Sequence, residues 1–420
     1  MAHHFLTLLL LLLLFTTPPP SLARLFLPSH LRRHPHFHDL PALRSLKDSL
    51  TDLPGSSFFS TWDFSLPSPN PCLSFSGLTC SPDGLHVTIL SLGDSSLVRP
   101  ALAGFLPESL SSLSSLTQLL LSPGIVTGPI PPQLGLLRHL RVLSLPRNRL
   151  TGPIPPSLAS LRYLHTLDLS YNQLSGVVPA HLPSLPSLKV LVLSNNLLSG
   201  HLPPVSSHLL HLDLSRNHLS GPIPSYLPPS LRYLSLSRNL MWGPINSLSP
   251  LPELAYLDLS MNLFSGPVPP SLFRASLLSM HLQFNHFSGG VPAPVDRFDA
   301  ISYGPGSVVD LSHNSLTGEL TAVLAGVESL FLNNNHLTGP VPAEYIDSLK
   351  EGRTRTLLLQ HNYLTGFPLD KGNPLPDTAA VCLLYNCMVP PIGLEACPAS
   401  AGSQLSRPSS QCRVFGGRGR

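Results

Sequence analysis

Residues 140–148 read Leu-Arg-Val-Leu-Ser-Leu-Pro-Arg-Asn, residues 164–172 read Leu-His-Thr-Leu-Asp-Leu-Ser-Tyr-Asn, and residues 188–196 read Leu-Lys-Val-Leu-Val-Leu-Ser-Asn-Asn. The three stretches share the pattern LxxLxLxxN and begin at intervals of 24 residues. A pattern that returns at a fixed period of roughly 20–50 residues is typical of repeat proteins, whose units stack on their neighbours. The pattern therefore predicts a solenoid.

The repeat extends in both directions from these three copies. Two earlier copies have Ser95 and Gly124 where Asn is expected, and later copies differ slightly in length. Together they predict about twelve repeats over residues 85–369. The Asn positions of the repeats are Asn148, Asn172, Asn196, Asn217, Asn239, Asn262, Asn285, Asn314, Asn335 and Asn362.

Each position of the pattern has a role that follows from its chemistry. The leucines of LxL alternate with an exposed residue, which is the period of a short strand with one buried face. Such a unit cannot bury its leucines alone, so the strands are expected to stack as a parallel sheet lining a concave wall. An Asn side chain both donates and accepts hydrogen bonds, so it can satisfy backbone groups where the chain turns. We therefore expect a buried ladder of Asn residues.

A Gly-x-Ile-Pro segment or a near copy follows the Asn, as at residues 128–131, 152–155 and 221–224. Proline lacks an N–H donor and disfavours helix at the residue before it. The outer wall is therefore expected to be extended, with at most a short helical turn such as the one from Ser157 to Leu161. The same prolines exclude a coiled coil.

The N-terminal residues have the features of an export signal. An apolar run from Leu6 to Phe15 is followed by Ser21-Leu22-Ala23, which has small residues at the positions that precede a cleavage site. The run is shorter than the ~20 residues that a membrane-spanning helix needs. Residues 1–23 are predicted to be a signal peptide, and residues 24–38, rich in His, Arg and Pro, a flexible segment rather than a metal site.

Six cysteines in an exported chain indicate disulfide bonds. Cys72 and Cys80 precede the repeats, whereas Cys382, Cys387, Cys397 and Cys412 follow them. This placement predicts disulfide-bonded caps at the two ends of the solenoid. The four C-terminal cysteines allow three pairings, among which the sequence does not choose.

The repeated LxxLxLxxNxLxGxIP resembles the leucine-rich repeats of plant extracellular proteins, namely receptor-kinase ectodomains, receptor-like proteins and polygalacturonase-inhibitor-type proteins. Residues 39–47 resemble the helix of that family's N-terminal cap, and Trp62 with Cys72 and Cys80 resembles its capping Trp and disulfide. The resemblance implies a right-handed leucine-rich-repeat superhelix with a parallel β-sheet on the concave face and disulfide-bonded caps at 39–84 and 370–420. The sequence departs from the family pattern in having no kinase domain, no transmembrane helix and no Asn-x-Ser/Thr sequon.

Composition and motifs favour a binding protein over an enzyme. Only 11% of the residues are charged and the formal net charge is +3, which is too little for electrostatic binding of nucleic acid. The sequence contains no P-loop, no Gly-x-Ser-x-Gly elbow, no kinase signature and no usual metal-ligand spacing. Asp168, Asp213 and Asp258 recur with the repeat, so they are interpreted as exposed strand residues rather than acid/base pairs. We expect no catalytic residue, metal or cofactor.

The variable positions of the concave strands are the candidate binding site. Because neighbouring strands are ~4.8 Å apart, Tyr233 and Tyr256 are expected side by side. Tyr, Arg, Phe and Met are enriched in protein interfaces. The face also carries five histidines, whose protonation in a mildly acidic fluid is expected to attract an anionic partner. They are His165, His211, His281, His313 and His361. The predicted binding residues are Asp213, Arg216, Tyr233, Arg238, Tyr256, Asp258, Met261, His281 and Phe284.

The hypothesis that follows is a secreted recognition protein of the extracellular space or cell wall. It would bind a protein or peptide on the concave face, in cell-surface signalling or defence, with a co-receptor kinase as a possible partner. One alternative is an inhibitor of a secreted microbial wall hydrolase. Another is a structural cell-wall protein that binds pectin. The sequence does not identify the ligand.

Overall fold

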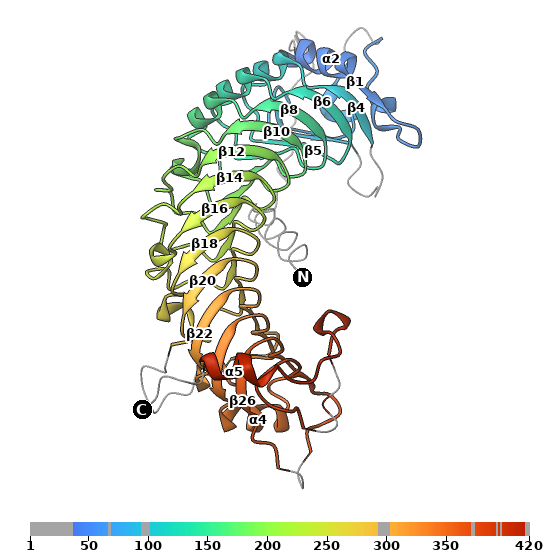
Figure 1. Cartoon of the computed structure of the whole chain (residues 1–420). Coiled ribbons are helices and arrows are strands. Elements are labelled where there is room, and N and C mark those ends of the chain that lie inside the picture. Colours follow the sequence, from blue (N-terminus) through green and yellow to red (C-terminus); the bar gives the residue numbers. More distant parts are fainter. Residues whose placement is uncertain are drawn as a thin grey trace. The chain divides into compact units, whose positions relative to one another are not determined.

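The computed structural model describes residues 37–65, 69–93, 101–292, 303–370, 374–391, 394 and 397–415. The signal peptide predicted at 1–23 lies outside these residues. The described residues form a curved stack of repeats, in which short helices occupy the outer side of the curve (Figure 1). The predicted solenoid of stacked parallel strands is confirmed.

The first sheet contains one short strand from each repeat, so strands that are 20 or more residues apart in sequence become neighbours. Among the described residues it has 14 strands, all parallel except β2 (Leu78–Cys80), which is antiparallel to β3. The parallel strands are β3 (Val87–Leu92), β5 (Gln118–Leu121), β7 (Val142–Ser144), β9 (Thr166–Asp168), β11 (Val190–Val192), β13 (His211–Asp213), β15 (Tyr233–Ser235), β17 (Tyr256–Asp258), β19 (Ser279–His281), β21 (Val308–Asp310), β23 (Ser329–Phe331), β25 (Thr356–Leu358) and β27 (Ala380–Cys382).

The extended segments after the Asn pair with one another in a second, 13-stranded sheet, which the sequence analysis did not predict. Strands β4 to β24 of this sheet end at or next to a glycine with a positive φ, such as 76° at Gly152. Its members are β1 (Leu50–Asp52), β4 (Leu102–Phe105), β6 (Ile125–Pro129), β8 (Arg149–Pro153), β10 (Gln173–Val177), β12 (Leu197–His201), β14 (His218–Gly221), β16 (Leu240–Gly243), β18 (Leu263–Gly266), β20 (His286–Gly289), β22 (Ser315–Glu319), β24 (His336–Pro340) and β26 (Tyr363–Gly366).

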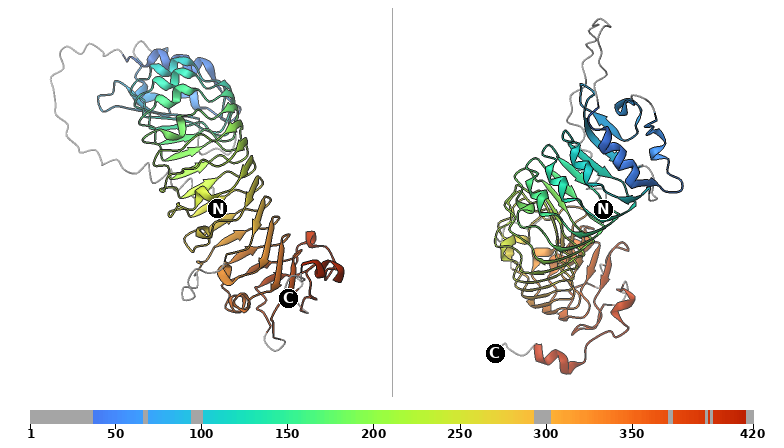
Figure 2. Two further views of the ribbon diagram at one scale, coloured as in Figure 1. Left: turned by 60° about the vertical axis from the view of Figure 1, so that its left-hand side comes forward. Right: turned by 90° about the horizontal axis from the view of Figure 1, so that it is seen from above.

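The outer side of the repeats carries short helices that follow the prolines. Most are single 3-10 turns, and the predicted turn at 157–161 corresponds to η4 (Pro156–Ser160). Figure 2 shows these helices as a separate row along the stack. They are η2 (Glu108–Ser112), η3 (Pro132–Leu136), η4, η5 (Leu182–Ser184), η6 (Asn246–Leu248), η7 (Pro270–Leu272), η8 (Ala322–Leu324) and α4 (Ala343–Lys350).

The Asn ladder is present and buried, as predicted. At Asn217, Nδ2 donates to the carbonyl oxygens of Leu193 and Leu214, both at 3.0 Å, and Oδ1 accepts from the backbone N–H of Leu198 at 3.0 Å. One side chain thus bonds two successive repeats at the point where the strand ends. All ten predicted members are at most 8% exposed.

The ladder has one more member than the sequence analysis predicted. Asn386 is fully buried, and its Oδ1 accepts from the N–H of Leu364 at 3.0 Å. Strand β27 precedes it and pairs with β25. The prediction that the C-terminal cap begins at residue 370 is therefore wrong, because residues 378–386 form a thirteenth repeat whose first two leucines are replaced by Thr378 and Val381.

The N-terminal cap closes the first repeat with helix α2 (Leu40–Ser49), β1, η1 (Phe58–Thr61) and α3 (Pro71–Ser74). Trp62 is fully buried, stacks on Phe75 at 5.2 Å and donates its indole N–H to the carbonyl of Ser76 at 2.9 Å. Cys72 is bonded to Cys80, as the resemblance implies. The predicted flexible segment ends too late by two residues, because Phe37 packs against the core and His38 lies against His86.

The C-terminal cap contains two disulfides, which resolve the pairing that the sequence left open. Cys382 is bonded to Cys397, and Cys387 to Cys412. The cap also includes η9 (Ala399–Ala401) and α5 (Ser409–Phe415). The guanidinium of Arg407 lies 4.0 Å from the ring of Tyr363 and 4.4 Å from that of Tyr385, so it joins the cap to the last repeats.

Membrane insertion finds no support in the described part of the chain. None of its helices combines the length and the apolar character that a bilayer-spanning segment requires.

Candidate functional site

The predicted binding residues lie in three parallel rows on the repeats that contain β13 to β21. Strand register places Tyr233 between His211 and Tyr256, and Asp258 between Ser235 and His281. The aromatic row is His211, Tyr233 and Tyr256; the acidic row is Asp213, Ser235, Asp258, His281 and Asp310; and the turn row is Arg216, Arg238, Met261, Phe284 and His313. We call the three rows together the concave strip.

The aromatic row is a continuous stack of rings. The ring centroids of His211 and Tyr233 are 4.0 Å apart with an interplanar angle of 8°, and those of Tyr233 and Tyr256 are 4.3 Å apart with an angle of 2°. The ring of His281 follows at 5.8 Å from Tyr256 and is tilted. Because each ring lies against the next, the faces of the rings contact one another and their edges remain for a ligand.

The stack owes its order to the spacing of parallel strands. Neighbouring strands lie ~4.8 Å apart, which is close to the thickness of a stacked aromatic ring pair. Side chains at equivalent positions of successive repeats therefore stack when they are flat. The sequence analysis predicted Tyr233 beside Tyr256 but left His211 out of the site, although it occupies the same repeat position.

The acidic row is held by hydrogen bonds within each repeat. Oδ1 of Asp213 accepts from the N–H of Ser215 at 3.0 Å and from its hydroxyl at 2.7 Å. Asp258 with Ser260 and Asp310 with Ser312 repeat this arrangement. The serine two residues later therefore orients each carboxylate on the surface.

Burial in the concave strip changes the protonation of the acidic row. The pKa of Asp213 is raised because its carboxyl group is desolvated, and this effect exceeds the opposing hydrogen bonds from Ser215. Desolvation likewise raises the pKa of Asp310 and that of Asp168. The interpretation of Asp168 as an exposed residue is wrong, because it is only 6% exposed. Desolvation also raises the pKa of the Tyr256 hydroxyl to about 12.

The expectation that histidine protonation makes this face positive is wrong at two of its histidines. Desolvation lowers the pKa of His211 to about 4, so this ring is neutral in a mildly acidic fluid. The pKa of His313 is also lowered, again mainly by desolvation. His211 therefore adds no positive charge to the aromatic row in such a fluid.

The turn row is more exposed and has an unusual backbone. All five residues have φ between 53° and 57°, in the left-handed region that side chains other than Gly rarely adopt. The N–H of Arg216 bonds the carbonyl of Ser237 in the next repeat at 2.8 Å, so the turn also connects repeats. Phe284 is 44% exposed and stacks on His313 at 4.1 Å. His313 was likewise missing from the predicted site.

The three rows together form a surface of mixed chemistry. Ring edges lie beside carboxylates, and the arginines Arg216 and Arg238 lie beyond the carboxylates at the ends of the strands. Aromatic and Arg side chains are the groups that contribute most at protein interfaces, whereas catalysis would need an acid, base or nucleophile in a cleft. The described residues contain no cluster of three or more His, Cys, Asp or Glu arranged for a metal ion.

Comparisons with known proteins agree with the repeat architecture. Sequence models described as leucine rich repeats match residues 138–198 and 208–229, and the model of the leucine rich repeat N-terminal domain matches residues 37–81. A search of curated protein sequences found no match.

Three solved structures are among those similar to this chain. A plant ice-binding protein is 27% identical with a TM-score of 0.54, over 68% of this chain and 88% of its own. The ectodomain of the receptor kinase GASSHO1/SCHENGEN3 from Arabidopsis thaliana, in complex with CASPARIAN STRIP INTEGRITY FACTOR 2, is 24% identical with a TM-score of 0.54, over 84% and 53%. The plant peptide hormone receptor RGFR1, in complex with RGF2, is 27% identical with a TM-score of 0.49, over 68% and 54%. The chain thus spans about half the length of these two receptor structures.

Proposed function

Because the chain is a leucine-rich-repeat protein of the plant extracellular type, we propose that it is an extracellular recognition protein that binds a peptide or protein on the concave strip. The observation that carries this proposal is the continuous ring stack from His211 to Tyr256 beside the oriented carboxylates of Asp213 and Asp258. The three disulfides suit an oxidising extracellular compartment. The protein is proposed to act without catalysis.

The chemistry of the strip specifies the kind of ligand. A Lys or Arg side chain, or a free N-terminus, would pair with Asp213 or Asp258, whose carboxylates lie two repeats apart with Ser235 between them. An apolar ligand side chain would cover the ring edges of Tyr233 and Tyr256. An acidic ligand group would reach Arg216 or Arg238 at the strand ends. A segment that combines all three groups is a polypeptide.

The test is binding of extracellular proteins to the purified protein and to the double variant Tyr233→Ala/Tyr256→Ala. The partner should be retained by wild type and lost from the double variant, because truncating central aromatic residues costs about 2 kcal/mol or more in a typical interface. Tyr226→Ala is the matched control, since Tyr226 is 57% exposed and lies outside the strip. Equal retention by all three proteins would contradict the proposal.

The same experiment separates the two alternatives from the recognition role. Retention of a secreted wall hydrolase whose activity falls on binding would assign the strip to an inhibitor. Retention of pectin alone, with no protein, would assign the chain to wall structure. A co-receptor kinase among the retained proteins would support signalling.

A second candidate function is binding to ice. The similarity to a plant ice-binding protein over 88% of that chain favours it, together with a row of hydroxyl groups on the second sheet. Regularly spaced hydroxyls on neighbouring strands can hold ordered water. The row is Thr127, Thr151, Ser175, Ser199, Ser220, Ser265, Ser288, Thr317, Thr338 and Thr365, with Trp242 interrupting it.

Ice recrystallisation distinguishes this candidate from peptide recognition. Wild-type protein should slow the growth of ice grains, and Ser220→Arg/Ser265→Arg should remove the effect while leaving partner binding to the concave strip unchanged. Normal ice growth in the presence of the wild-type protein would eliminate the candidate.

A further inference from the structure

The distribution of charge along the chain is uneven. Between residues 109 and 212 there are six Arg or Lys residues and a single acidic residue, Asp168. From 213 to 369 there are eight Arg or Lys residues and eleven Asp or Glu residues. Asp168 is buried and its carboxylate accepts from the hydroxyl of Ser170 at 2.6 Å, so it contributes little to the surface. The early repeats therefore present a cationic surface.

The solenoid gathers these cations along one edge of the first sheet. Arg141, His165 and Lys189 occupy equivalent positions just before β7, β9 and β11, and their backbones are linked, with the N–H of His165 bonding Arg141 at 2.8 Å and that of Lys189 bonding His165 at 2.9 Å. Arg138 and Arg162 occupy a second equivalent position three residues earlier in their repeats. We call these five residues with Tyr163 the cationic edge.

The arginines of this edge lack the acidic partners that Arg232 and Arg355 have in later repeats. Arg138, Arg141 and Arg162 are exposed, and none forms an ion pair with any residue that the structure describes. At the position equivalent to Arg141 in later repeats, Arg232 lies 3.7 Å from Glu253 and Arg355 lies 3.6 Å from Glu328. At this repeat position, Arg232 and Arg355 are therefore each paired with a glutamate, whereas Arg141 is not.

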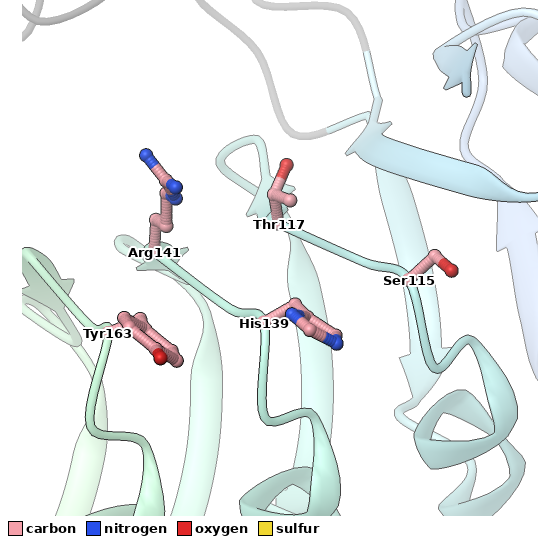
Figure 3. A pocket seen from close by; sticks show the side chains of 5 residues that line it. All are labelled: Ser115, Thr117, His139, Arg141 and Tyr163. Carbon is pink, nitrogen blue, oxygen red and sulfur yellow. The ribbon is translucent and has the colours of Figure 1, made fainter. Parts of the chain in front are cut away.

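Two hollows meet at Tyr163 along the cationic edge. One, of about 470 Å³, is lined by Ser115, Thr117, His139, Arg141 and Tyr163. Figure 3 shows these side chains on the segments that lead into the strands of three successive repeats. The other hollow, of about 540 Å³, also has Tyr163 in its wall, together with Arg138 and Arg162. Both volumes fall within the ~300–1,000 Å³ of ordinary small-ligand sites.

Tyr163 is the apolar element of this edge. Its side chain is 57% exposed, and its carbonyl bonds Nδ1 of His165 at 2.7 Å, which fixes the two residues relative to each other. An exposed aromatic ring flanked by guanidinium groups can pack against the apolar face of a sugar ring while the arginines bond its anionic substituents. A planar guanidinium binds a carboxylate or sulfate through two parallel hydrogen bonds.

We propose that the cationic edge binds an acidic oligosaccharide, a sugar chain that carries carboxylate or sulfate groups at regular intervals. Arg138 and Arg162 lie one repeat apart, at the ~4.8 Å spacing of the strands, and Arg141 and Lys189 lie two repeats apart. They therefore suit a ligand whose charges also recur along an extended chain. An acidic peptide fits less well, because the backbone N–H groups of Arg141, His165 and Lys189 are already bonded within the sheet and cannot pair with a peptide strand. This site is independent of the concave strip.

The experiment measures binding of oligogalacturonate, a sulfated heparin oligosaccharide and poly-glutamate, matched in charge, to the full-length protein. Wild type should bind at least one of the two sugars. Arg141→Ala/Arg162→Ala should weaken that binding about tenfold or more, since each charge-assisted contact is worth ~1.5–3 kcal/mol and 1.4 kcal/mol is tenfold. Arg232→Ala/Arg355→Ala removes the same charge from paired arginines and should change the dissociation constant less than about twofold.

Further variants distinguish a specific sugar-binding site from non-specific electrostatic binding. Tyr163→Ala should weaken sugar binding and Tyr163→Phe should retain it, whereas Tyr233→Ala/Tyr256→Ala should leave it unchanged. Preference for galacturonate assigns carboxylate as the recognised group, and preference for heparin assigns sulfate. The proposal is overturned if wild type binds neither sugar, if the two double arginine variants bind equally, or if poly-glutamate binds as tightly as the preferred sugar.

Discussion

The concave strip on β13 to β21 and the cationic edge before β7 to β11 are built from the same repeat, yet they carry opposite chemistry. In the strip, flat rings stack on one another and carboxylates are partly desolvated, which raises the pKa of Asp213. At the edge, arginines are exposed and have no acidic partners among the described residues. The backbone geometry of the repeat is constant, so the difference arises from the side chains at its variable positions.

This difference indicates how one scaffold can hold two sites. A strand position in the middle of the sheet has neighbours on both sides, so side chains there are crowded and lose water. A position in the segment before the strand lies at the border of the sheet and remains solvated. Substitutions in the strip are therefore expected to change both stability and binding, whereas substitutions at the edge should change binding alone.

Replacing an Asn of the ladder should cause the largest loss of stability. Asn217 lies after β13, and Asn217→Leu leaves the N–H of Leu198 and the carbonyls of Leu193 and Leu214 without this partner. The two carbonyls still accept from Asn196 and Asn239, so the N–H of Leu198 is the group left unsatisfied. With about 1–3 kcal/mol for one unsatisfied buried group, and with the two other hydrogen bonds of Asn217 also lost, we expect a loss of about 3 kcal/mol in the free energy of unfolding. Denaturant unfolding measures it.

The matched control is a neighbouring Asn outside the ladder. Asn195 has a φ of 57° on the surface turn, so Asn195→Gly should change stability by less than about 1 kcal/mol. If Asn217→Leu lowered the free energy of unfolding no more than Asn195→Gly, the hydrogen bonds of the ladder would not be what stabilises the stacked repeats.

The second prediction concerns the buried histidine of the strip. In the folded protein the pKa of His211 is lowered from 6.5 to about 4. Between these two pH values the histidine is protonated in the unfolded chain but neutral in the folded protein. Stability should therefore fall as the pH decreases through this window, by at most about 3 kcal/mol from this group. His211→Phe keeps a ring against Tyr233 and should remove this part of the pH dependence.

Unfolding curves at pH 7 and pH 4.5 provide the measurement. His139→Phe is the matched control, because it makes the same replacement at an exposed histidine outside the concave strip. An unchanged pH profile in His211→Phe would mean that the ring is more hydrated than the strip geometry implies.

Much of the fold could be predicted because the repeat makes local and global preferences agree. Each part of the repeat has one structural role: the LxL leucines, the Asn and the Gly-Pro segment. Because the same pattern recurs along the chain, every copy supports the same fold. The thirteenth repeat was missed because Thr378 and Val381 stand where leucine is expected. The second sheet was missed because extended segments rich in proline and glycine give no pattern that identifies their partner strands.

The sequence predicted where the residues of the candidate site lie, but not the protonation of its His and Asp side chains. Repeat register alone placed Tyr233 beside Tyr256. The protonation of His211 and Asp213 depends on how far neighbouring repeats exclude water, and this is not encoded in the spacing of residues. The cationic edge was also missed, because the absence of acidic partners for Arg141 becomes visible only when the repeats are stacked.

The smallest expected effect tests the desolvation of the acidic row. The raised pKa of Asp213 means that the folded protein holds its proton more tightly than the unfolded chain, so ionisation at neutral pH costs stability. Asp213→Asn preserves an oxygen that can accept from Ser215 and carries no charge. The variant should therefore melt at a slightly higher temperature than wild type at pH 7.

The advantage should shrink at pH 3, where the wild-type carboxyl is also protonated and the two side chains become alike. Arg141→Gln, at the exposed edge, should leave the melting temperature unchanged at both pH values. A lower melting temperature for Asp213→Asn at pH 7 would show that the hydrogen bonds from Ser215 stabilise the ionised carboxylate by more than its burial costs. In that case the strip would present full negative charges to its ligand, and the contrast with the cationic edge would be electrostatic alone, without a difference in hydration.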